Sequence, residues 1–205
     1  IIGGYLLDGK DSFEELEAAV LTESRSKEKN LGGKGMKFPG GSIFMTPESV
    51  GKEIGSLVKV RHPFLVKTIC FTVEENRMEG CQASLRIYRM DSEDNLMNIV
   101  TMPIYQDIPK ATDETTFSIA PEESITLDPG ESYISFSLME ISQEIMDRWA
   151  ESDTWSDEKR FDMYRQDRVY FPLYLKGSYT RSNSKEPLTK WGANIGIEVM
   201  GIERK

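Results

Sequence analysis

Histidine and cysteine, which often act as nucleophile, base or metal ligand, are scarce in this chain. His62 is its only histidine, and Cys70 and Cys81 are its two cysteines. A Ser-His-Asp or Cys-His device would have to use His62, which lies beside Pro63 in an expected turn and is better explained as an exposed loop residue. One histidine and two cysteines without a C-x-x-C pair also leave zinc short of ligands. We therefore expect no such catalysis, no metal and no cofactor.

The two cysteines leave two alternatives open. Cys70 and Cys81 lie eleven positions apart on what read as consecutive strands. They could form a disulfide in an oxidising compartment, or they could stay as buried free thiols. The sequence favours neither, so it gives no conclusion about redox compartment.

Aromatic residues in an acidic stretch form the candidate ligand-binding site: Trp149, Trp155 and Tyr164. Another tryptophan, Trp191, lies near the end of the chain. Sugar-binding modules present flat aromatic rings beside carboxylates and amides, because the faces of a pyranose are apolar and its edges form hydrogen bonds. The alternative is structural, with Trp149 and Phe161 attaching helices to a sheet, since large rings bury large areas. Both interpretations stay open.

Three other constellations carry weaker signals. The chain has 34 acidic residues, enough for the carboxylate pair of a glycosidase, but nothing selects which two. The glycines at 32–41 lack the G-K-[ST] ending of a phosphate-binding loop. The turn at 91–95 is rich in oxygen ligands, yet it lacks the alternating spacing of a dedicated Ca²⁺ loop and is better explained as a solvated turn.

Composition excludes several partners. The chain has 205 residues, 39% hydrophobic and 29% charged, as expected for a globular protein with its own core. Its net charge is −9, and its basic residues are scattered among acids. Such a chain repels phosphate backbones and anionic membrane surfaces, so we expect no nucleic-acid partner and no membrane insertion. It begins IIGGYLLDGK without an initiator Met, from which we expect that a leader or upstream domain has been removed.

The elements that must position these residues are predominantly strands. Residues 53–90 predict three strands that each bury one face, because apolar residues such as Ile69, Phe71 and Val73 alternate with Cys70 and Thr72. Further strand candidates bring the total to nine or ten: 98–105, 116–119, 124–127, 133–138, 169–175 and 194–202. No strand-helix alternation is present, so we expect a mainly β fold, an antiparallel jelly-roll-like β-sandwich.

Other segments carry specific expectations. Residues 142–168 show helical spacing, with Ser142 and Ser156 as N-caps, and predict a short helical insertion. In 133–138, Tyr133 and two serines should face solvent, opposite an apolar face. Pro172 places its strand at an edge or a bulge. Residues 22–41 are rich in charge and glycine and predict a linker or wide loop, the best candidate for a domain boundary.

Three segments together resemble a domain found in secreted and surface proteins of Gram-negative bacteria, where it follows a carboxypeptidase-regulatory-like β-domain. Residues 15–22, ELEAAVLT, are similar to the closing strand of that upstream domain, L-x-E-V-V-V-T. Residues 51–60, GKEIGSLVKV, are similar to the opening strand G-x-E-I-G-x-x-I-K. Residues 85–88, LRIY, are similar to F-R-[IL]-x-[IL]-Y and precede a Pro-Ile element at 103–104. The chain departs from the pattern at Ala18 and Ala19 and in the helical insertion.

The resemblance implies an exported protein, periplasmic or at the cell surface, with a jelly-roll-like fold and no catalytic residues. Residues 1–30 would be an N-terminal segment, possibly the end of the upstream β-domain, and 31–205 the β-sandwich domain. We expect a non-catalytic binding or assembly module whose partner is a protein or an envelope glycan. The alternatives are a carbohydrate-binding module, a glycan-active hydrolase with a carboxylate pair, and a structural domain that packs against its upstream neighbour.

Overall fold

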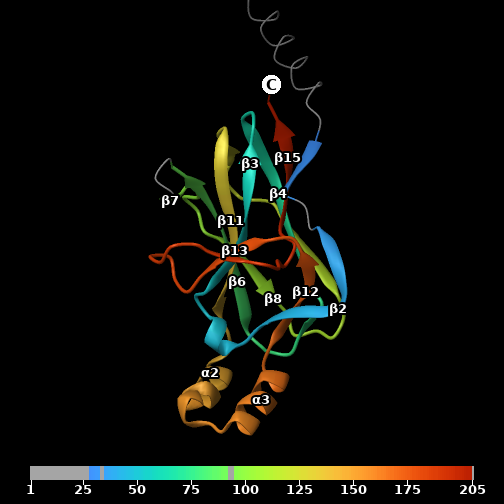
Figure 1. Cartoon of the computed structure of the whole chain (residues 1–205), viewed down its shortest axis with the longest axis vertical. Helices are drawn as coiled ribbons and strands as arrows, with labels where there is room; N and C mark the ends of the chain where they lie inside the picture. The colour runs from blue at the N-terminus through green and yellow to red at the C-terminus, as the bar shows by residue number, and fades with distance from the viewer. Residues whose placement is uncertain (1–27, 33–34, 92–94, 205) are drawn as a thin grey trace, which may run out of the picture.

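The computed structural model describes residues 28–32, 35–91 and 95–204, and over these ranges the protein is mainly β with two short α-helices (Figure 1). This confirms the mainly β, antiparallel class expected from the period-two pattern. The strands are β1 (Glu28–Gly32), β2 (Met36–Met45), β3 (Glu53–Val60), β4 (Phe64–Val73), β5 (Glu75–Asn76), β6 (Cys81–Met90), β7 (Leu96–Asn98), β8 (Ile104–Ile108), β9 (Thr115–Ile119), β10 (Thr126–Leu127), β11 (Gly130–Glu140), β12 (Val169–Leu175), β13 (Ser178–Arg181), β14 (Thr189–Trp191) and β15 (Glu198–Glu203). The helices are α2 (Gln143–Trp149) and α3 (Asp157–Gln166), with 3₁₀ turns η1 (Pro47–Ser49) and η2 (Ser152–Thr154).

Within the described residues the strands form three antiparallel sheets. The five-stranded sheet has the order β1-β15-β4-β10, with β9 also paired to β4. The seven-stranded sheet has the order β14-β13-β3-β11-β6-β7, with β8 also paired to β6, and the three-stranded sheet has the order β2-β12-β5. This topology shows a layered antiparallel β protein, but it does not show the jelly-roll connectivity expected from the sequence.

One hydrophobic core joins the three sheets. Phe71 comes from the five-stranded sheet, Phe136 from the seven-stranded sheet and Phe171 from the three-stranded sheet. The ring of Phe136 lies edge-on to both others, with centroids 5.1 Å apart in each pair. All three are fully buried, and each contributes about 1.5–3 kcal/mol to folding by leaving water. The apolar faces predicted from alternation therefore meet at one point.

Strand β11 differs from its prediction, because both of its faces are buried. Tyr133, Ser135 and Ser137, expected to face solvent, are 0%, 0% and 1% exposed. Strand β13 contacts this face: the hydroxyl of Tyr133 donates to the carbonyl oxygen of Tyr179, on β13, at 3.0 Å. The alternation was correct, but a later segment covers the polar side as well. The seven-stranded sheet thus carries a second buried layer.

The predicted linker at 22–41 is wrong over its described part, because β1 and most of β2 lie there. The side chains of β1 show no strand pattern, and this strand is defined by its backbone pairing with β15, from Glu28 opposite Ile202 to Gly32 opposite Glu198. Strand β1 therefore spans the predicted boundary between residues 30 and 31. Residues 1–27, which hold most of the expected upstream segment and the 15–22 motif, lie outside the described residues.

Two other strand predictions are resolved in detail. The single strand expected at 98–105 is wrong: β7 ends at Asn98 and β8 begins at Ile104, both paired to β6. Strand β12 forms as expected, and its register with β2 shifts between Pro172 and Tyr174. The bulge alternative for Pro172 is therefore confirmed, since a proline has no N–H to donate to a regular ladder.

The helical insertion is confirmed, and α2 and α3 lie together at the end of the molecule opposite β15 (Figure 1). The side chain of Ser156 accepts from the backbone N–H of Lys159 at 3.3 Å, a regular N-cap. Ser142 occupies the cap position of α2 but makes no such bond. None of the helices in the described part of the chain has the length and apolar character needed to cross a membrane.

The structure decides between the two alternatives for the cysteines, and both are free. Cys70 lies on β4, where its Sγ is 3.0 Å from the hydroxyl of Ser118. Cys81 begins β6 in the seven-stranded sheet, and its Sγ lies 3.7 Å from Oδ1 of Asn76. Burial raises the pKa of the Cys81 thiol to about 11. A protonated, buried thiol of this kind is chemically inert.

Candidate ligand-binding cavity

The structure brings the three predicted site residues together in the helical insertion; Trp149, Trp155 and Tyr164 are called the tryptophan cluster below. Trp149 lies on α2, Trp155 follows η2, and Tyr164 lies on α3. The ring centroid of Trp149 is 5.0 Å from that of Trp155 and 5.7 Å from that of Tyr164. Trp149 and Trp155 are only 5% and 9% exposed. Their rings therefore contact protein where a sugar would need an open face.

Hydrogen bonds connect the tryptophan cluster to its surroundings. Nε1 of Trp149 donates to Asp167 at 2.7 Å, and the hydroxyl of Tyr164 donates to Glu48 of η1 at 2.8 Å. The ammonium group of Lys159 lies 4.9 Å from the centroid of the Trp155 ring. Ligand binding by these aromatics stays a prediction, but the contacts favour the structural alternative. Phe161 is not part of the attachment, since it is 61% exposed.

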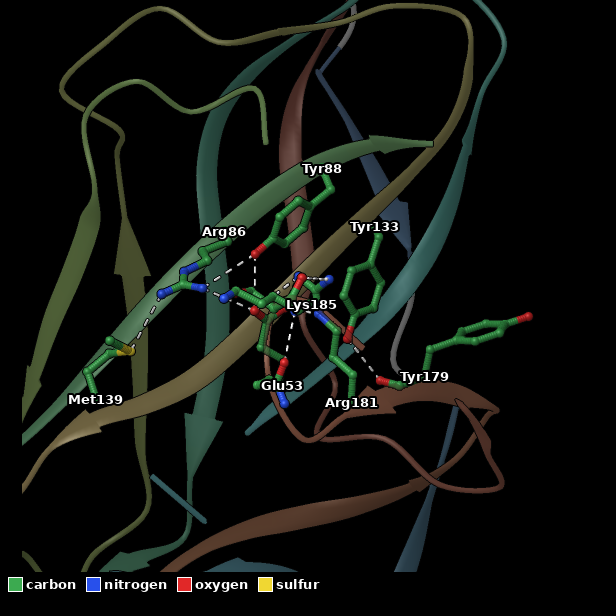
Figure 2. A network of polar contacts seen from close by, with 10 residues as sticks. Glu53, Arg86, Tyr88, Tyr133, Met139, Tyr179, Arg181 and Lys185 are labelled. Carbon is green, nitrogen blue, oxygen red and sulfur yellow. Dashed lines mark hydrogen bonds and ion pairs between the residues drawn. The ribbon is translucent and has the colours of Figure 1, made fainter. Parts of the chain in front are cut away.

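A buried carboxylate organises the second layer on the seven-stranded sheet, and Figure 2 shows its partners. Glu53 begins β3 and is 2% exposed. Its Oε1 accepts from Nη1 of Arg86 at 3.1 Å, from the hydroxyl of Tyr88 at 3.0 Å and from Nη2 of Arg181 at 3.1 Å. Its Oε2 accepts from Nε and Nη2 of Arg181 at 3.1 and 2.9 Å. We call Glu53, Arg86, Tyr88 and Arg181 the Glu53 network.

The Glu53 network is structural in character. Both carboxylate oxygens of Glu53 are occupied by donors, so Glu53 has no position from which to accept a proton from a substrate. The guanidinium carbon of Arg181 lies 4.6 Å from the centroid of the Tyr88 ring, which stacks against Tyr133. Burial raises the pKa of both tyrosines above the ordinary value of 10. Arg181 also donates to the carbonyl oxygen of Ser184 at 3.0 Å, which attaches the loop after β13.

Beside the Glu53 network lies a cavity of about 320 Å³, between β2, the start of β3 and the β13–β14 hairpin. Two partly exposed rings line it: Phe44 of β2, 48% exposed, and Trp191 of β14, 40% exposed. Lys52 and Glu186 add one charge of each sign to the lining, and Arg181 belongs to it as well. Partly open rings next to hydrogen-bonding groups are a usual composition for a small-ligand site.

A second cavity, of about 290 Å³, is lined mainly by polar residues, among them Arg89, Glu123 and Asp128. The charged side chains of this cavity already make hydrogen bonds or ion pairs with neighbouring residues. Glu123 accepts from the backbone N–H of Thr101 at 2.7 Å and from that of Met102 at 3.1 Å. Arg89 pairs with Asp128 at 3.1 Å. The lining of this second cavity includes no aromatic ring among the described residues, so the cavity beside the Glu53 network is the better candidate.

Metal and histidine chemistry find little support in the described part of the chain. No group of three or more His, Cys, Asp or Glu side chains among the described residues is placed to hold a metal ion. In the 91–95 turn, Asp91 accepts from the backbone N–H and side-chain amide of Asn95 at 2.9 and 3.0 Å. His62 is exposed in the turn between β3 and β4, which confirms its interpretation as a loop residue.

Comparison with known proteins adds no relative: the sequence matches no protein-family model and no curated protein. The function must therefore be argued from the geometry.

Sequence reasoning missed the cavity and the Glu53 network. Trp191 was noted as an aromatic, but it was not connected with Phe44. A usable signal was present, because Glu53, Arg86 and Tyr88 are charged or hydroxyl-bearing residues inside strand motifs that are otherwise apolar. Such residues in a strand are expected either to face solvent or to pair with one another. The sequence could not indicate Arg181, which contacts both Glu53 and Tyr88.

Proposed function

We propose that this protein is a non-catalytic binding module and that its ligand occupies the cavity lined by Phe44 and Trp191. The observation that carries the proposal is the pair of partly open rings at one cavity of about 320 Å³, next to hydrogen-bonding groups of both charges. A glycan is the ligand class that best fits this lining, since sugar faces stack on rings while their hydroxyls need donors and acceptors. A protein segment is the alternative ligand.

We propose a non-catalytic module because the acidic side chains that line the cavity already accept hydrogen bonds from neighbouring residues. Glu53 is saturated by its donors, as described above. Glu186 accepts from the side-chain amide of Asn183 at 3.0 Å, a bond within its own loop. A glycosidase needs one carboxyl group as acid and a second as base or nucleophile. Because both oxygens of Glu53 already accept hydrogen bonds, the described lining residues do not provide two acidic side chains available for this chemistry. This supports ligand binding without turnover.

The proposed setting is an exported protein, periplasmic or at the cell surface, with a jelly-roll-like sandwich. Support comes from the strand motifs at 51–60 and 85–88, which are similar to those of the domain that follows a carboxypeptidase-regulatory-like β-domain. The first motif contains β3 and the second lies in β6, and their residues Glu53, Arg86 and Tyr88 meet in one network. Export remains a proposal drawn from this resemblance.

The test is thermal unfolding of the purified chain with a panel of polysaccharides. A ligand that binds only the folded state adds about 2.7 kcal/mol of stability at a hundredfold excess over its Kd. We expect one glycan class to raise the Tm of the wild type, and the rise to disappear in Trp191→Ala. Phe161→Ala is the matched control, because it removes an exposed ring on α3 away from the cavity.

Three outcomes would overturn parts of the proposal. A shift that survives Trp191→Ala but is lost in Trp155→Ala would return the site to the tryptophan cluster. No shift with any glycan would leave a protein segment as the ligand, to be tested with the same two variants. Release of reducing sugar by the wild type, abolished by a single Glu→Gln or Asp→Asn change, would show an enzyme.

A further inference from the structure

The outer face of the three-stranded sheet carries a row of side chains that starts at Phe44, in the cavity lining, and continues outside the cavity. Phe44 on β2 pairs in register with Tyr170 on β12, and Tyr170 pairs with Glu75 on β5. Arg168 precedes Tyr170 by two positions and lies beside Arg77, whose backbone N–H donates to the Arg168 carbonyl oxygen at 3.0 Å. The sheet register therefore places aromatic and cationic side chains next to each other on one face.

Two arginines lie over Tyr170, and a third is in contact with one of them. The guanidinium carbon of Arg168 lies 4.0 Å from the centroid of the Tyr170 ring, and that of Arg77 lies 5.7 Å from it. Nη1 of Arg77 donates to the carbonyl oxygen of Arg165, the last arginine of α3, at 2.7 Å. We call Arg77, Arg165, Arg168 and Tyr170 the arginine face. In a chain of net charge −9, this concentration of positive charge needs an explanation.

The charges of the arginine face are largely uncompensated. Glu75 pairs with Nε of Arg77 at 2.8 Å. The guanidinium groups of Arg168 and Arg165 make no hydrogen bond or ion pair with any described residue; they lie over aromatic rings, Arg165 over Phe161 at 5.4 Å. Nε of Arg168 is buried without a hydrogen-bond partner. An unused buried donor carries a desolvation cost that no described residue offsets.

Electrostatics point in the same direction as the geometry. Burial lowers the pKa of Arg168, and the charges of Arg77 and Arg165 lower it further, against the opposing effect of Glu75. The guanidinium group nevertheless stays protonated, because arginine does not lose its proton in proteins. An anion would relieve this repulsion. The planar fork of a guanidinium matches an oxyanion with two parallel hydrogen bonds.

We propose that the arginine face binds an oxyanion group of a ligand, a carboxylate, sulfate or phosphate, with the fork of Arg168 as its principal contact and Arg165 and Arg77 as flanking charges. Phe44 borders this site, since the Arg168 guanidinium carbon lies 5.9 Å from the centroid of its ring. Phe44 also lines the cavity, so it separates the two sites on β2. The anion site does not depend on a ligand in the cavity.

The experiment is an NMR titration of the full chain that follows the arginine Nε–Hε resonances. Sodium sulfate, phosphate and acetate are added in separate arms, each at constant ionic strength adjusted with chloride. We expect a saturable shift of the Arg168 resonance, and the arm that gives it identifies the oxyanion. Arg168→Gln, followed through the remaining Arg77 and Arg165 resonances, should weaken binding roughly tenfold or more, because a charge-assisted fork is lost. Arg168→Lys, which keeps the charge without the fork, should also weaken it.

Arg89→Gln is the matched control, since it removes one exposed positive charge from the seven-stranded sheet. It should leave the affinity unchanged. If all arms shift the Arg168 resonance linearly without saturation, or if Arg89→Gln and Arg168→Gln weaken binding equally, the anion responds only to overall charge and the proposal fails. Should Arg168→Gln fail to fold, Arg165→Gln on the surface of α3 gives the second test, with a smaller expected loss of affinity.

Discussion

The tryptophan cluster and the Glu53 network each hold a loop or helical segment in place, but they differ in how far apart in the sequence their bonded residues lie. Asp167 accepts from Trp149 and Arg148, residues 18 and 19 positions away within the same helical insertion. The bond from Tyr164 to Glu48 spans 116 positions, but it ends on η1 and not on a strand. Glu53 accepts from Arg86, 33 positions away, and from Arg181, 128 positions away. A local cluster can open while the sheets remain folded, whereas the Glu53 network joins β3, β6 and β13. The comparison predicts local unfolding in one case and global unfolding in the other.

The largest effect is expected for Glu53→Gln. It leaves the Arg181 guanidinium, 3% exposed, buried without its counter-charge, which should cost about 3–5 kcal/mol of the free energy of unfolding. Urea unfolding followed by circular dichroism measures this loss, and one cooperative transition should shift. Glu79→Gln is the control, because its pair with Lys110 is exposed and should contribute less than about 1 kcal/mol. Equal losses in the two variants would show that the Glu53 network does not stabilise the sheets.

A smaller effect, confined to the helices, is expected for Asp167→Asn. The change removes charge-assisted bonds to Arg148 at 2.8 Å and to Trp149 at 2.7 Å, at a cost of about 1.5–3 kcal/mol. Hydrogen exchange should accelerate in α2 and α3 while the strands keep their protection. Asp162→Asn, exposed on α3, is the control. Faster exchange throughout β3 and β11 would contradict the distinction between local and global contacts.

The smallest effect concerns alkaline pH, which should act on the Glu53 network through its tyrosines and not through the tryptophan rings. Burial raises the pKa of Tyr88 and Tyr133 in the folded state, so the unfolded chain ionises first. Stability is therefore complete well below pH 10 and falls as the pH rises through 10, with a loss of about 0.4 kcal/mol per tyrosine at pH 10 itself. Urea unfolding between pH 8 and about 11 measures this fall. A Cys81→Ala background is needed, because Cys81 adds its own loss above pH 9.

Tyr133→Phe supplies the check on this pH dependence. It removes one buried phenol and should flatten the decline above pH 10. It also removes the 3.0 Å bond to Tyr179, so its stability at neutral pH should be lower than that of the parent. An unchanged alkaline slope in this variant would mean that the buried phenols do not control the titration.

The same distinction, between contacts that are local in the sequence and contacts between distant residues, explains what the sequence could predict. Periodicity is local, so it identified most strands, the helical insertion, the Ser156 cap and the alternation of β11. It could not show that Tyr133 contacts β13, because that contact joins residues 46 positions apart. It also missed β1, whose residues are almost all exposed and whose support is backbone pairing with β15.

The candidate sites follow this rule as well. Trp149, Trp155 and Tyr164 were expected to act together and do lie together, since they belong to one short insertion. The cavity needs Phe44 from β2 and Trp191 from β14, and their meeting depends on how two sheets are placed. The arginine face combines α3, the residue after β5 and the start of β12 with the residue before it, and no spacing along the chain brings Arg77 to Arg168.

The contact of Arg181 with Ser184 has a consequence for recognition. The loop after β13 forms part of the cavity wall, and the ion pair with Glu53 holds its first residues before any ligand arrives. Binding then loses less conformational entropy than it would with a loop that orders only around its ligand. Association should occur in one kinetic phase, and loosening the loop should raise Kd even where every contacting side chain is kept.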